Sequence, residues 1–159
     1  MKLAIPTVDG EFTAHYSERG LAQLDFAGDQ RSHSSDTLAP ARASEWHKTT
    51  TLALKEILAG KNPAKLPPLD LSCGTEFQRR VWNALLKIRA GKTQSYGQVA
   101  EAINHPRSTR AVGGACGANP IPVIVPCHRV LAAKGRLGGF SSGLDWKVKL
   151  LNREGIQLC

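Results

Sequence analysis

The sequence predicts an α/β chain of the α+β type, built from two small domains. Residues 1–71 are expected to form a small antiparallel sheet with one helix, and residues 72–159 a winged-helix-like helix-turn-helix domain. Apolar residues alternate along the first 27 positions, which is typical of strands with one buried face. They then recur at helical spacing, and two capping boxes begin consecutive helices in the second half. Three prolines within residues 61–70 cannot continue a helix, so we place the domain boundary there.

Two turns divide the first 27 residues into a meander of strands. Asp9-Gly10 has the composition of a hairpin turn, and Arg19-Gly20 marks the next turn. Alternating apolar residues predict the buried face, namely Phe12, Ala14 and Tyr16, then Ala22, Leu24 and Phe26. Residues 28–43 are polar and without period, and are expected to form a surface connection. A helix of about 15 residues should follow, with Ser44 as its N-cap and Gly60 just beyond its end.

Three helices are predicted at the start of the second half. The first two begin with a hydroxyl residue three positions before a glutamine, as Thr75 precedes Gln78 and Ser95 precedes Gln98. The first of them is expected to end at Gly91. The third runs from Ser108 to about Ala118 and contains three glycines, which cost roughly 3 kcal/mol of helix propensity. Either tight helix packing or close approach to another surface is expected to compensate for that cost.

Charge is divided unevenly between the two halves. Residues 1–71 carry 8 Lys+Arg and 9 Asp+Glu, a net charge of −1, whereas residues 72–159 carry 13 and 4, a net charge of +9. Such asymmetry indicates a polyanionic partner, nucleic acid first and an anionic membrane second, although a basic surface can also serve solubility alone. No apolar run approaches the ~18 residues of a membrane span, and the first residues do not resemble a signal peptide.

The four cysteines, Cys73, Cys116, Cys127 and Cys159, are predicted to be free thiols. The gaps between them are 43, 11 and 32 residues, which match no common zinc framework, so no metal site is expected. A chain without a secretory signal is expected in a reducing compartment. Most cysteines of this kind are small, buried apolar residues, and at most one or two should be reactive.

The segment Cys127-His128 is the candidate reactive centre. An apolar extended run over residues 121–126 leads to it. An unperturbed thiol is only about 3% ionised at neutral pH, and a neighbouring imidazole can remove its proton to give a strong nucleophile. Such a base needs an acid to orient it, and Glu154 is one of only four acids in the second half. The alternatives are an inert buried thiol, a core histidine and a solvated glutamate.

Several motifs of the second half, in this order and spacing, resemble the O6-alkylguanine-DNA alkyltransferase family. The active-site signature of that family is similar to Pro126-Cys127-His128-Arg129-Val130. The resemblance extends over residues 72–157 through five further motifs, which are Gly74-Thr75-Glu76-Phe77-Gln78, Ser95-Tyr96-Gly97, Arg110-Ala111-Val112-Gly113, Asn119-Pro120 and Leu150-Leu151 with Glu154-Gly155. Residues 1–71 resemble the variable amino-terminal domain of that family only in outline.

The resemblance implies a role for each motif residue in alkyl transfer. Cys127 would accept the alkyl group as a thioether, with His128 forming the thiolate through a water molecule and Glu154 completing the relay. Tyr96 would press on the phosphate 3′ to the lesion and donate a proton toward the departing base. Arg110 would fill the gap left by the flipped nucleotide.

The resemblance also implies supporting residues around this centre. Ser95 and Thr109 would contact the DNA. The substrate pocket would include Val130, Phe140 and Ser141, and Asn119 would hold the glycine-rich helix against the active-site segment. Phe140 stands where some members of the family carry tyrosine, a difference expected to change the tolerance for bulky alkyl groups.

The implied activity is single-use DNA repair, in which the alkyl group of O6-alkylguanine moves irreversibly to Cys127. The implied partner is double-stranded DNA containing that lesion, bound by a cytoplasmic monomer without cofactor, metal or membrane. Three rivals remain: a damage binder that flips the base without transfer, a cysteine hydrolase, and a helix-turn-helix regulator. The presence of Cys127 argues against the first, and the charge of the second half against the hydrolase.

Overall fold

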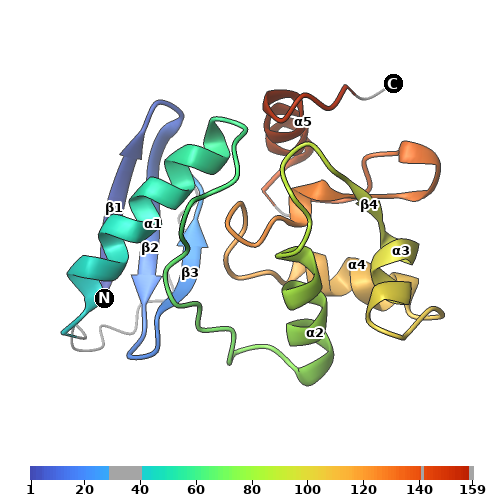
Figure 1. Cartoon of the computed structure of the whole chain (residues 1–159), viewed down its shortest axis with the longest axis horizontal. Coiled ribbons are helices and arrows are strands. Elements are labelled where there is room, and N and C mark those ends of the chain that lie inside the picture. Colours follow the sequence, from blue (N-terminus) through green and yellow to red (C-terminus); the bar gives the residue numbers. More distant parts are fainter. Residues whose placement is uncertain (29–40, 141, 158–159) are drawn as a thin grey trace.

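The computed structural model describes residues 1–28, 41–140 and 142–157, so residues 29–40 of the surface connection expected over 28–43 lie outside the described residues, and the prediction is wrong at Ala43, which is buried and begins a helix. The chain begins with the predicted meander, an antiparallel sheet in the order β1-β2-β3 (Figure 1). Its strands are β1 (Lys2–Thr7), β2 (Gly10–Tyr16) and β3 (Leu21–Asp25). The buried positions alternate as predicted except at Ala22, because an irregularity between His15 and Tyr16 shifts the register and buries Leu21 instead.

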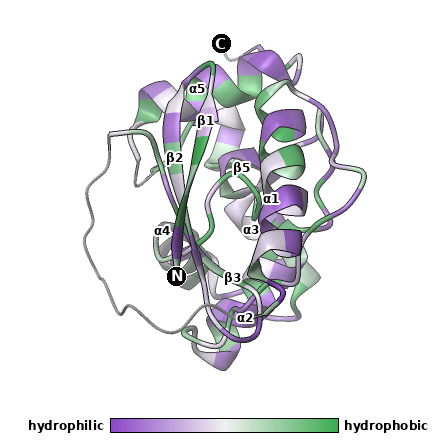
Figure 2. Ribbon diagram, turned by 90° about the vertical axis from the view of Figure 1, so that its left-hand side faces the viewer, coloured by the Kyte–Doolittle hydropathy of each residue, from purple (hydrophilic) through white to green (hydrophobic). Residues whose placement is uncertain are grey.

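Helix α1 (Ala43–Leu58) lies along one side of this sheet, and hydrophobic and hydrophilic residues alternate along its turns (Figure 2). The prediction that Ser44 caps the helix is wrong, since Arg42 is the N-cap and makes no side-chain capping bond. Burial of Ala43 against the core extends the helix past the position that a local capping bond would favour. The predicted end is confirmed, because Gly60 follows the C-cap with φ +80°.

The second half contains the three predicted helices, α2 (Glu76–Leu85), α3 (Tyr96–Ala102) and α4 (Thr109–Gly117). Both predicted capping boxes are present, with the hydroxyls of Thr75 and Ser95 accepting from backbone amides three residues later. Helix α2 ends at Leu85, so the prediction that it continues to Gly91 is wrong. The carbonyl of Ile88 accepts instead from Nη1 of Arg129, at 2.6 Å, which places this residue outside the helical ladder.

A short parallel pair stands beside the three helices and connects them to the remaining segments. Strand β4 (Gln94–Ser95) pairs with β5 (Val130–Leu131). The 3₁₀ turns η1 (Cys127–Arg129) and η2 (Ala133–Gly135) flank β5, and helix α5 (Leu144–Arg153) follows them. The pairing matters for the site because it places the start of α3 next to the segment that contains Cys127.

One hydrophobic core runs through both halves, with Phe12, Leu54, Val81 and Val125 among its members. Asp9 in the β1–β2 turn accepts two hydrogen bonds from the guanidinium of Arg153, at 2.6 and 2.7 Å. This ion pair joins the first hairpin to the end of α5. None of the helices in the described ranges combines the length and apolarity that crossing a membrane would require.

Candidate active site

The segment before Cys127 is a tight, buried loop held by one asparagine. Asn119, directly after α4, donates from Nδ2 to the carbonyl of Val125 at 2.8 Å, and its Oδ1 accepts from the amide of Ile121 at 2.9 Å. The amide of Cys127 then donates to the carbonyl of Val125 at 2.8 Å. The two ends of the loop are thereby fixed to α4, so the position of Cys127 is set relative to that helix.

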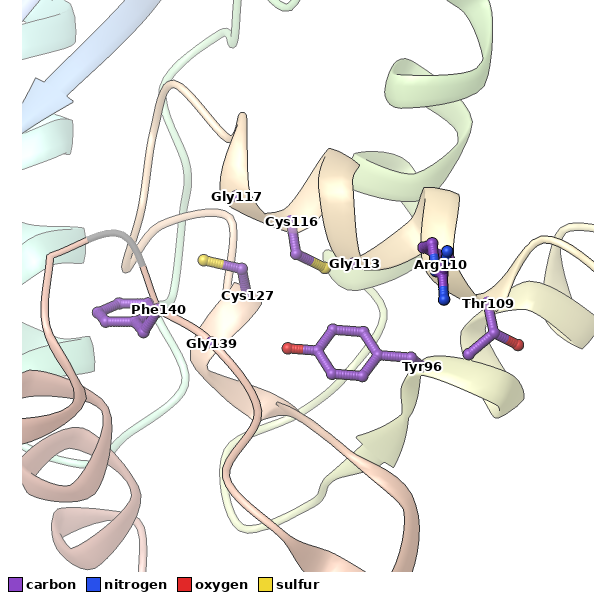
Figure 3. Close-up of a pocket in the computed structure, with 9 residues that line it drawn as sticks. All are labelled: Tyr96, Thr109, Arg110, Gly113, Cys116, Gly117, Cys127, Gly139 and Phe140. Atoms are coloured by element: carbon purple, nitrogen blue, oxygen red, sulfur yellow. The ribbon is translucent and has the colours of Figure 1, made fainter.

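Cys127 lies at the edge of a cavity of about 790 Å³ between α3, α4 and the loop before α5 (Figure 3). Only 4% of its surface is exposed. Residues from these three segments and from η1 line the cavity, namely Tyr96, Thr109, Arg110, Gly113, Cys116, Gly117, Cys127, Gly139 and Phe140. In Figure 3 the hydroxyl of Tyr96 points toward Gly139 and Cys127, while the side chain of Arg110 lies at the start of α4, farther from Cys127.

The side chain of His128 is buried, and it forms a cluster with the side chains of Glu154 and Arg129. Its Nε2 lies 3.2 Å from both carboxylate oxygens of Glu154, the C-cap residue of α5. The same carboxylate accepts from Nε of Arg129 at 2.7 and 3.0 Å. The structure therefore brings His128 and Glu154 into direct contact, and adds Arg129 to the pair.

These contacts define the protonation of the cluster. Burial alone would raise the pKa of Glu154, but hydrogen bonds from His128 and Arg129 hold it below its usual value, so this side chain is a carboxylate. Burial lowers the pKa of His128, which is therefore neutral near pH 7. A neutral imidazole that donates from Nε2 to Glu154 carries a lone pair on Nδ1. This atom is buried and has no hydrogen-bond partner among the described residues, so it is available as a base.

The thiol of Cys127 needs such a base. Burial raises its pKa to about 11, although the side chain of Asn119 and the charge of Lys147 both favour the thiolate. At neutral pH only about one thiol in 10⁴ would then ionise without help. Cys116 borders the same cavity, and burial raises its pKa further, to about 12. Of these two thiols, Cys127 is the one adjacent to a histidine held as a base.

Tyr96 opens α3 and forms one wall of the cavity. A Cβ atom at Gly138 would lie 2.7 Å from its hydroxyl, so the loop can approach the ring only because this position is glycine. Gly138 also has φ +68°, a conformation that other residues rarely adopt. Burial raises the pKa of Tyr96, so the phenol keeps its proton and can donate a hydrogen bond into the cavity.

Lys147 is the residue at this site that the sequence analysis missed. It lies in α5 and is completely buried, with Nζ donating to the carbonyls of Leu137 and, at 3.1 Å, Gly139. The ammonium is 5.9 Å from the centre of the Tyr96 ring. Its position three and four residues before Leu150 and Leu151, on the apolar face of the helix, was the available signal.

Helix α4 has glycines on a side that the other described residues of the protein do not cover. Gly113 packs near the Tyr96 ring, where an added Cβ would be 3.9 Å from Cε1. Apart from the adjacent residues and the backbone of α4 itself, no atom of the described residues lies within 4 Å of the positions that Cβ atoms would take at Gly114 and Gly117. Internal packing therefore does not account for these two glycines, which favours the other expectation, that an external surface approaches α4. Thr109 and Arg110 are exposed in its first turn.

Of the four remaining predicted site residues, one lines the cavity, two lie elsewhere in the fold and one is not described. The hydroxyl of Ser95 caps α3, with Gln98 donating from its amide at 3.0 Å. Val130 is fully buried in β5, three positions after Cys127. Phe140 lines the cavity, and Ser141 lies outside the described residues.

Fold and site together define a class, a helix-turn-helix protein with a buried cysteine, a histidine and a glutamate beside a cavity. A family model, the DNA-binding domain of 6-O-methylguanine DNA methyltransferase, matches residues 76–156. A methylated-DNA–protein-cysteine methyltransferase of Methanosarcina mazei is 41% identical over 142 residues, which cover 86% of this chain and 85% of that protein. The chain belongs to the 6-O-methylguanine DNA methyltransferase family.

Two mycobacterial proteins extend the comparison. A methylated-DNA–protein-cysteine methyltransferase of Mycobacterium leprae is 56% identical over 90 residues, covering 57% of this chain and about half (54%) of that protein's length. The crystal structure of Mycobacterium tuberculosis OGT in complex with DNA superposes with a TM-score of 0.72 and 37% identity, over 95% of this chain and 90% of that one. The likeness thus includes the N-terminal half, which the family model leaves out.

Proposed function

We propose that the protein repairs DNA by moving the alkyl group of O6-alkylguanine to Sγ of Cys127. The observation that carries the proposal is the arrangement of Cys127 at the cavity with His128 next to it, held by Glu154. Membership of the methyltransferase family supports this chemistry, as do the names of the relatives from M. mazei and M. leprae.

The proposed reaction starts with proton removal from the thiol. Nδ1 of His128 takes the proton, directly or through water, and the carboxylate of Glu154 stabilises the imidazolium that forms. The thiolate of Cys127 then attacks the alkyl carbon, so that the S–C bond forms as the C–O6 bond breaks. The electron pair of that bond goes to O6, and the guanine gains one proton overall. The hydroxyl of Tyr96, which points into the cavity, is placed to donate that proton, and the proton that His128 took from the thiol restores the phenol through solvent.

The product explains why each molecule would act once. A thiolate is a poor leaving group from the carbon of a neutral thioether, so the S–C bond formed on Cys127 is not easily broken. Release of the alkyl group from Cys127 would need a reaction that this site does not provide. The protein would therefore be consumed in equal number with the lesions that it repairs.

Helix α4 is the proposed contact with the DNA duplex. Its exposed small residues allow close approach of the helix to a groove, and Arg110 and Thr109 stand at its start beside the cavity. A base inside a duplex cannot reach Cys127, so the nucleotide must be flipped out at a cost of a few kcal/mol. Arg110 would occupy the gap, while Tyr96 and Ser95 would contact the flanking backbone.

We further propose that the protein acts as a monomer in the cytoplasm, without a cofactor. Cys73, Cys116 and Cys127 are unpaired among the described residues, which suits a reducing compartment. Asn119 would maintain the geometry by fixing the segment before Cys127 to α4.

Mass spectrometry with a defined lesion tests the proposal. The protein is incubated with duplex DNA containing one O6-methylguanine, and its intact mass and peptides are then measured. We expect the gain of one methyl group per molecule, on the peptide that contains Cys127. Cys127→Ala should abolish the gain and keep DNA binding, whereas Cys116→Ala, which removes the other thiol of the cavity, should keep both. Binding without methyl gain would support the damage binder or the regulator, and the absence of both would leave the hydrolase.

A further inference from the structure

The edge strand of the N-terminal sheet reaches both segments that border the acceptor thiol. The amide of Leu24 in β3 donates to the carbonyl of Pro120 at 2.9 Å, at the start of the loop that leads to Cys127. Two residues later in the sequence, Phe26 packs against Phe140 on the other side of the cavity. One short stretch of the N-terminal half therefore contacts both the loop that leads to Cys127 and one residue that lines the cavity.

The contact between Phe26 and Phe140 has the geometry of a favourable aromatic pair. The ring centres are 5.9 Å apart and the planes are at 88°, an edge-to-face arrangement. Phe26 is 4% exposed and lies in the core, whereas Phe140 is half-buried and lines the cavity. Phe26 is itself held by Trp146 of α5, with ring centres 4.9 Å apart.

The loop that carries Phe140 lacks regular secondary structure over residues 136–140. Its carbonyls at Leu137 and Gly139 are held by Lys147, but a backbone contact leaves the ring of Phe140 free to take other rotamers. Among the described aromatic pairs, the ring contact of Phe140 is with Phe26. The position of this cavity wall thus depends on a residue from the other half of the chain.

We propose that Phe26 is a specificity-determining positioning residue, which sets the size of the alkyl group that the cavity accepts by fixing the ring of Phe140. The inference rests on the proposed alkyl transfer to Cys127. Phe26 is not among the residues that line the cavity, and in this proposal it acts through Phe140. With Phe26 shortened, the ring of Phe140 can withdraw from the cavity toward the first domain, and a bulky group gains room that a methyl group does not need.

The test compares two lesions in the full-length protein. Two duplexes are identical except for O6-methylguanine or O6-benzylguanine, and single-turnover rates are measured from the intact mass. Phe26→Leu should raise the ratio of benzyl to methyl transfer by about 2- to 12-fold, the range that corresponds to the energy of one aromatic pair. A merely structural role would slow both reactions together and leave the ratio unchanged.

Phe12→Leu is the matched control. Phe12 is fully buried in the same cluster, and its ring contacts among the described residues are with Phe26 and Trp146. Its replacement should lower stability by a similar amount and leave the ratio at the wild-type value. An unchanged ratio in Phe26→Leu, or an equal change in Phe12→Leu, would overturn the inference.

Two further variants keep the outcome decisive. Should thermal unfolding show that Phe26→Leu does not fold, Phe26→Met keeps most of the volume, lacks the ring, and gives the same test. In a Phe140→Ala background, Phe26→Leu should change the ratio no further, because the ring through which it acts is gone. Failure of the wild type to gain a methyl group would instead refute the proposed function, which makes the two failures distinguishable.

Discussion

Replacement of Glu154 by alanine should destabilise the protein strongly, because it leaves a buried guanidinium without its partner. The carboxylate accepts four close contacts, two from Nε2 of His128 at 3.2 Å and two from Nε of Arg129 at 2.7 and 3.0 Å. The side chains of Arg129 and Glu154 are 5% and 1% exposed. Removal of one partner of such a pair costs about 3–5 kcal/mol, since the other charge stays buried.

Thermal unfolding followed by circular dichroism measures this loss. For a domain of this size, 1 kcal/mol corresponds to about 2–4 °C, so the expected fall in Tm for Glu154→Ala is roughly 6–20 °C. Glu101→Ala, which removes an exposed carboxylate from α3, should change stability by less than about 1 kcal/mol. Equal effects of the two substitutions would refute the reasoning from buried charge.

The ion pair between Glu154 and Arg129 should also make stability depend on pH. The folded pKa of Glu154 is below its ordinary value of 4.5, so its contribution is complete above pH 4.5 and is lost as the pH falls through the folded pKa. The slope of Tm against pH below 4.5 should therefore be steeper in the wild type than in Glu154→Gln. Equal slopes would contradict the assignment.

Three further predictions concern transfer. Because burial lowers the pKa of His128 from 6.5, the single-turnover rate should be constant from pH 8 to 6.5 and fall only below that; a rate proportional to hydroxide would contradict a histidine base. Lys147→Gln should raise the pKa of Cys127 and slow transfer at pH 7 about tenfold for each unit of the rise, whereas Lys149→Gln, at an exposed site of the same helix, should not. Arg110→Ala should slow transfer from duplex DNA about tenfold or more and leave transfer from free O6-benzylguanine unchanged; equal rates on the duplex would exclude its part in base flipping.

Local features of the structure could be predicted from the sequence because they depend on neighbouring residues. The capping boxes of Thr75 and Ser95 need only a hydroxyl and a glutamine three positions apart, and both were confirmed. The hairpin at Asp9-Gly10 was confirmed for the same reason. Where distant contacts decide, prediction failed, as at the end of α2, where Arg129 takes the carbonyl of Ile88.

In the candidate site, too, the residues that lie on sequence motifs could be predicted, and those that depend on distant contacts could not. The residues on the motifs, such as Cys127 and His128, could be identified from the resemblance, and the structure places His128 against Glu154. Lys147 could not, because a lysine within a charged helix is ordinary until a loop folds over it. The support of Phe140 by Phe26 depends on docking of the two halves, which no local pattern describes.

The ion pair between Asp9 and Arg153 has a consequence for the order in which the molecule becomes competent. These residues are 144 positions apart, and Arg153 directly precedes Glu154. The hairpin around Asp9 can form early from local contacts, whereas a contact of such separation must wait until the intervening chain is made and closed. During synthesis, a ribosome-bound chain would present a folded sheet long before it could react with a lesion. The proposed repair activity would then appear in one step, when α5 docks and completes the cluster around His128.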